Sequence, residues 1–84
     1  MTVRKLESEL INVYYNHTPM GWSLTIWKAG EDYPIYESIT LAGSLGASIA
    51  YALTTCGVEW DAAVAYVTVC FGLEVIDDEG ETWN

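Results

Sequence analysis

Residues 22–40 read WSLTIWKAGEDYPIYESIT, two short runs of alternating apolar and polar residues on either side of a turn-forming segment. In the first run, alternate residues from Trp22 to Ile26 are apolar and are expected to share one face of a strand. Residues 30–34 break the alternation, and residues 35–40 resume it. The pattern predicts an antiparallel β-hairpin with a loop of about four or five residues.

The residues before this hairpin fit an amphipathic helix. At 100° per residue, the apolar side chains of residues 2–15 gather on one face and most polar ones gather on the other. Glu7 is the exception, because it falls among the apolar residues. We therefore expect an N-terminal helix with Thr2 as its N-cap.

Two further helices are expected after the hairpin. Residues 41–55 carry an apolar stripe together with small residues, such as Gly46 and Ala50, that let a neighbouring element approach closely. Residues 61–71 contain several strand-forming valines, but Asp61 suits a first helical turn and Gly72 suits a C-terminal stop, so a helix is favoured.

The last residues are expected to form a short hairpin, with a strand at residues 73–76, an acidic turn and a return at residues 81–83. The predicted fold is a single α+β domain over residues 1–84. Its elements are an N-terminal helix, a β-hairpin, two helices joined by a tight turn, and a short C-terminal hairpin.

Charge is the most informative property of this chain. Twelve Asp and Glu against three Lys and Arg give a formal net charge of −9. All three bases lie at or before Lys28, and the 56 residues from Ala29 onward contain ten acids and no Lys, Arg or His. Direct nucleic-acid binding is excluded, because phosphate contacts need clustered Lys and Arg. The acids are instead available to a partner with a basic surface.

The candidate binding residues are therefore acids with few cationic partners in the chain and large aromatic side chains that can anchor an interface. The acids are Glu59, Asp61, Asp77, Asp78, Glu79 and Glu81, and the aromatics are Trp22, Trp27, Tyr36 and Trp83.

No catalytic, cofactor or metal site is predicted, because the chain lacks the motifs that phosphate binding, zinc binding and nucleophilic catalysis need. The single histidine, His17, is expected in a solvent-facing loop. Cys56 and Cys70 are expected to be buried free thiols in a reducing compartment. No apolar run follows the first two bases, so no signal peptide is expected.

Two other interpretations fail on composition. Residues 38–58 are uncharged, but nine of the 21 are Ser, Thr or Gly and no base flanks them, so a buried helix is favoured over a membrane span. Residues 49–72 loosely resemble a helix-turn-helix, yet residues 59–72 hold two acids and no base and would repel phosphates.

In size, acidity and lack of enzyme motifs, the chain resembles small phage and mobile-element inhibitors of the anti-CRISPR and anti-restriction class. This resemblance covers composition and no alignable motif. It implies a cytoplasmic inhibitor or adaptor that docks on a basic surface of a nucleic-acid-handling protein and can mimic nucleic acid. The alternative is a self-assembling structural subunit, a homodimer joined through the small-residue helix at residues 41–55.

Overall fold

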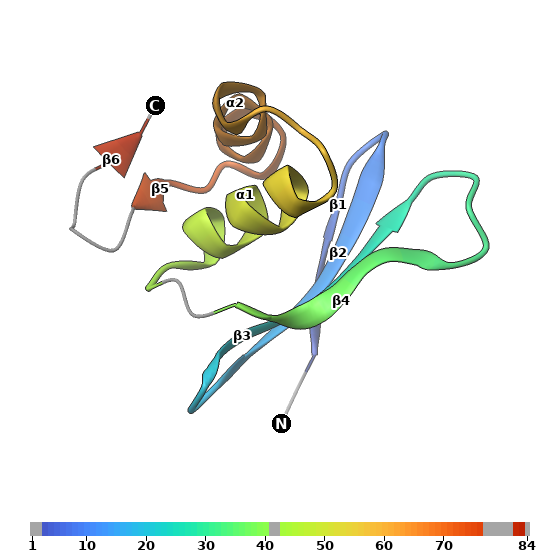
Figure 1. Cartoon of the computed structure of the whole chain (residues 1–84), viewed down its shortest axis with the longest axis horizontal. Coiled ribbons are helices and arrows are strands. Elements are labelled where there is room, and N and C mark those ends of the chain that lie inside the picture. Colours follow the sequence, from blue (N-terminus) through green and yellow to red (C-terminus); the bar gives the residue numbers. More distant parts are fainter. Residues whose placement is uncertain (1–2, 41–42, 77–81, 84) are drawn as a thin grey trace.

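Four antiparallel strands form one sheet in chain order, and two helices lie on one of its faces (Figure 1). The computed structural model describes residues 3–40, 43–76 and 82–83. The strands of the sheet are β1 (Arg4–Glu7), β2 (Ile11–Thr18), β3 (Gly21–Lys28) and β4 (Pro34–Thr40). They are followed by α1 (Leu45–Thr55), α2 (Trp60–Phe71) and the paired short strands β5 (Val75–Ile76) and β6 (Thr82–Trp83).

The prediction of an N-terminal helix is wrong, and the sheet has four strands instead of two. Residues 4–18 form β1 and β2, with Leu6 opposite Val13 in the ladder. In β2, the buried side chains of Ile11 and Val13 alternate with the more exposed Asn12 and Tyr14. The apolar spacing in this segment fits a helix only by coincidence. In the structure, every second side chain of β2 lies on one face of the strand, and pairing with β3 buries that face.

Ser8 closes the turn between β1 and β2, in the segment where a helix is predicted from the sequence. The Ser8 backbone N–H donates to the Ile11 carbonyl at 3.0 Å, and the Ser8 hydroxyl donates to the same oxygen at 2.8 Å. The Ser8 hydroxyl also hydrogen-bonds the hydroxyl of Tyr66 in α2. The turn therefore ties the first strand pair to the second helix.

The central hairpin is where the sequence predicts it, as β3 and β4, but it contains an irregularity. Ile26 pairs with Tyr36 while Trp27 pairs with Pro34, so Ile35 is an extra residue in β4. Such a bulge lets two consecutive side chains approach one face of a sheet. Both Ile35 and Tyr36 accordingly pack against the core.

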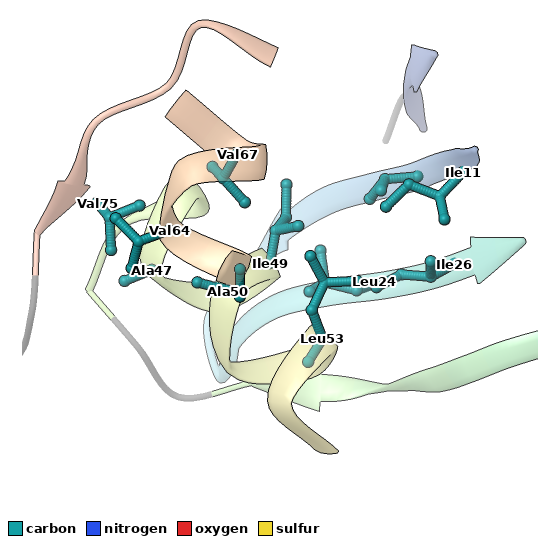
Figure 2. Packing of buried hydrophobic residues seen from close by; sticks show 13 residues of the cluster. Ile11, Leu24, Ile26, Ala47, Ile49, Ala50, Leu53, Val64, Val67 and Val75 are labelled. Atoms are coloured by element: carbon teal, nitrogen blue, oxygen red, sulfur yellow. The ribbon is translucent and has the colours of Figure 1, made fainter. Parts of the chain in front are cut away.

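The two predicted helices are also confirmed, and α1 is the central element of the core. It is buried at five consecutive positions from Gly46 to Ala50, and again at Ala52 and Leu53. A helix with buried residues on more than one side needs more than one neighbouring element to cover it. The sheet covers one side of α1, and α2 and β5 cover the other (Figure 2).

Small residues in α1 let its neighbours approach this closely. A Cβ atom on Gly46 would lie 2.0 Å from the backbone oxygen of Glu74, in the segment leading to β5. Ser44, the N-cap of α1, accepts from the Ala47 N–H at 3.2 Å and donates to the Ile76 carbonyl at 3.2 Å. Gly46 and Ser44 therefore set how the C-terminal segment lies across α1.

The small residues of α1 make contacts inside the domain. Gly46, Ala47 and Ala50 are buried within the chain. A homodimer through residues 41–55 stays a prediction that the structure of the single chain does not test.

Gly46→Ala is expected to lower the free energy of unfolding by at least about 2 kcal/mol, because a backbone carbonyl cannot move aside as a flexible side chain can. The expected loss runs against the helix propensity of alanine, which favours the substitution by about 1 kcal/mol. Urea denaturation followed by circular dichroism measures it.

Gly43→Ala is the matched control, because a Cβ there meets nothing within 4 Å. Its unfolding free energy should stay within about 0.5 kcal/mol of the wild type. Equal stability of the two alanine variants would contradict the close approach of α1 to the Glu74 backbone.

Candidate functional site

An apolar groove of about 650 Å³ lies at the end of the sheet where three connections meet. These are the β1–β2 turn at residues 8–10, the β3–β4 loop at residues 29–33 and the α1–α2 connection at residues 56–59. The Ala29 N–H donates to the Leu10 carbonyl at 2.9 Å and joins the first two of them. The groove is therefore built from segments far apart in the sequence.

The floor of the groove belongs to the domain core. Ile11 of β2 and Leu53 of α1 are buried and line it, together with the partly buried Ile35 of the β4 bulge. The thiol of Cys56 lies over β4 and donates to the Ile35 carbonyl at 3.5 Å. This contact holds the end of α1 against the bulged strand.

The walls of the groove are apolar and face solvent. Leu10 and Tyr33 are each 61% exposed, and Val58 is 37% exposed. All three line the groove, one from each of the three connections. Large apolar side chains gathered around a concavity are typical of a binding surface, whereas scattered ones are ordinary.

Exposed acidic residues lie in the segments that form the groove. We call five of them the rim. They lie in the three connections or in the first turn of α2, and they are Glu9, Glu31, Asp32, Glu59 and Asp61. Lys28 is the cationic residue among the lining residues. Among the described residues, no ion pair involves a rim carboxylate. The segments that form the groove therefore carry more negative than positive charge.

A second cation, Lys5 of β1, interacts with groups away from the groove. Lys5 pairs with Glu7 and lies over the Tyr14 ring, 5.4 Å from its centre. Hydrogen bonding to the Glu7 carboxylate, with a smaller effect of Tyr14, raises the pKa of Lys5. This group lies on the sheet face opposite the core, so it does not neutralise the rim.

Two of the predicted binding acids lie in the rim. Glu59 is the N-cap residue of α2, without a side-chain capping bond, and Asp61 lies in the first helical turn. Carboxylates at this position are stabilised by the helix dipole. These two carboxylates therefore also stabilise the start of α2. Their presence alone does not define a binding site.

The other predicted residues do not gather at the groove. Trp22 packs on the core side of the sheet, with its ring centre 4.5 Å from that of His17, and Tyr36 also packs against the core. Trp27 lies on the opposite face, across from Asn12. Trp83 is in β6.

The four remaining acids, Asp77, Asp78, Glu79 and Glu81, lie outside the described residues.

The sequence pattern does not point to the wall residues Leu10 and Tyr33 or to the rim acids Glu9, Glu31 and Asp32. The one signal in the sequence is the pair of acids directly before Tyr33 in a turn-forming loop. This loop meets residues 8–10 because of the β2–β3 register. A helix at residues 2–15 does not allow that register.

The expected environments of His17 and the cysteines need correction. His17 lies in β2 and not in a loop, although it is exposed. Cys56 and Cys70 are free thiols, but both are exposed. Both cysteines lie at or near the C-terminal end of a helix. Solvent reaches them there, although apolar residues flank them in the sequence.

Within residues 3–40, 43–76 and 82–83, no three metal-binding side chains lie close enough to hold an ion. In the same part of the chain, both helices are too short to cross a bilayer.

Comparison with protein-family models, with curated proteins and with solved structures finds no match to this chain. The case for a function therefore comes from the groove and its rim.

Alkylation of Cys56 should report the state of the groove. Desolvation at the groove raises the pKa of the Cys56 thiol, because it disfavours the thiolate. In a Cys70→Ser chain, iodoacetamide should react with Cys56 more slowly at pH 8 than in the same chain unfolded in urea. The midpoint of the rate against pH should lie higher in the folded chain.

The raised pKa of Cys56 also makes the stability of the fold depend on pH. The folded state binds the thiol proton more tightly than the unfolded state does, so the free energy of unfolding falls as the pH rises above the pKa of the unfolded thiol. A midpoint at or below that of the unfolded chain would show that the thiol does not face the groove.

Proposed function

We propose that this protein is a non-enzymatic inhibitor or adaptor that binds a larger protein through the groove and its rim. The partner presents a basic surface, as proteins that handle nucleic acid do. The site of action is the cytoplasm, in keeping with two free thiols.

One observation carries the proposal: the segments that form an apolar concavity carry five exposed carboxylates, which have no ion pair among the described residues. Exposed apolar side chains such as Leu10 and Tyr33 supply contact area that excludes water. The carboxylates speed the encounter with a cationic partner and disfavour anionic ones. Together these features support specific protein binding better than charge alone does.

Binding to the basic surface of the partner would be enough to inhibit it. A partner that uses Lys and Arg to hold phosphates loses access to them while they face the rim. A net charge of −9 strengthens this competition at low ionic strength. Nucleic acid should then compete with the protein for the partner.

The experiment is affinity capture from a host lysate at low and high salt, followed by mass spectrometry. Glu31→Gln combined with Asp32→Asn should reduce recovery of the partner by about fivefold or more at low salt, since each removes a charge from the rim. Both residues are exposed loop positions, so folding should be unaffected.

Glu37→Gln combined with Glu74→Gln is the matched control, because it removes the same charge at exposed positions outside the rim. Recovery with this control should stay close to that with the wild type. If the two double variants recover the partner equally well, or if the partner has no basic surface, the proposed function is wrong.

A further inference from the structure

We infer that the groove receives an amphipathic helix of the partner, whose apolar side chains enter the groove while flanking Lys and Arg residues meet the rim. This inference rests on the proposed function and names the chemistry of the partner at the same site.

The shape of the site supports insertion of apolar side chains. Its volume of about 650 Å³ falls within the range of about 300–1,000 Å³ that encloses small ligands. Its floor is made by Ile11, Ile35 and Leu53, which the domain already holds in place. A floor that is formed before binding reduces the entropy lost on association.

The aromatic rings at the groove favour a large apolar guest. Tyr33 is 61% exposed and offers a large aromatic surface to an inserted side chain. Tyr66 also lines the groove and is held by its hydrogen bond to Ser8. The groove therefore offers two aromatic rings to a large apolar side chain.

The charge of the rim selects among possible occupants. A second copy of this chain would bring its own acids against Glu31, Asp32 and Glu59, and it offers only three bases in all. Nucleic acid and anionic lipid surfaces would be repelled for the same reason. A segment that combines apolar residues with Lys and Arg complements the groove and the rim at once.

A helix meets both requirements within a short segment. Residues three and four positions apart share one face, so two or three apolar anchors can enter the groove together. Lys and Arg on the flanks of that face can then reach carboxylates of the rim. This geometry differs from a flat nucleic-acid mimic, which needs no apolar anchor.

A synthetic peptide tests the inference directly. The probe is a 15-residue amidated helix of Leu and Lys with leucines on one face, and the reporter is alkylation of Cys56 in the Cys70→Ser chain. The probe should slow alkylation and bind with measurable affinity by calorimetry. A scrambled peptide of the same composition and charge has no apolar face and should bind at least about fivefold more weakly.

Two variants separate apolar from charged contributions. Leu10→Ser combined with Tyr33→Ser leaves the charge unchanged and should weaken binding of the helical probe by at least about fivefold. Met20→Ser combined with Val69→Ser removes apolar side chains that are 70% and 81% exposed and do not line the groove. This control should bind the probe as the wild type does.

Three results would overturn the inference. One is equal binding of the helical and scrambled peptides. Another is binding that survives Leu10→Ser with Tyr33→Ser but is lost with Glu31→Gln and Asp32→Asn, which indicates a charge-only contact and leaves the proposed function standing. The third is a dimer in sedimentation that the Leu10→Ser and Tyr33→Ser variant dissociates, because a second copy would then occupy the groove.

Discussion

The fold depends on α1 being enclosed between the sheet and the C-terminal elements of its own chain. The helix has no charged side chain and is buried at five consecutive positions, while Tyr51 stays 38% exposed. The sheet meets one of its faces, and α2 and β5 meet the other. Contact is close enough that Gly46 leaves no room for a Cβ beside the Glu74 carbonyl. The groove begins at the C-terminal end of α1, where Leu53 and Cys56 line it.

The groove follows from this arrangement together with the β4 bulge. Ile35, the extra residue in β4, reaches the floor beside Leu53 at the end of α1, where Cys56 contacts its carbonyl. A domain of 84 residues has little interior, so its many apolar side chains are not all buried. Those that stay exposed at the meeting point of three connections form one concave surface. The surrounding acids remain in water, where carboxylates without a partner cost least.

Local patterns in the sequence predicted the elements whose signals are short-range. The alternation in β3 and β4 and the small-residue pattern of α1 gave the hairpin and the first helix, and Gly72, with φ of +66°, ends α2 as its position suggests. The error at residues 2–15 arose because leucine and valine spacing there satisfies a helix as well as a strand pair. Only pairing with β3 decides between them. The rim and walls could not be predicted, because residues 8–10 and 29–33 come together through that same long-range register, and residues 56–59 reach them only through the packing of α1.

The central claim is that recognition occurs at the groove and combines apolar contact with charge. Amide hydrogen exchange of the whole chain, alone and bound to the partner that it captures, tests this claim most directly. If recognition occurs at the groove, binding slows exchange at residues 8–10, 29–35 and 56–62 and leaves exchange unchanged at the β2–β3 turn around Met20. Protection at that turn or across the opposite sheet face, with exchange at the groove unaltered, would contradict it.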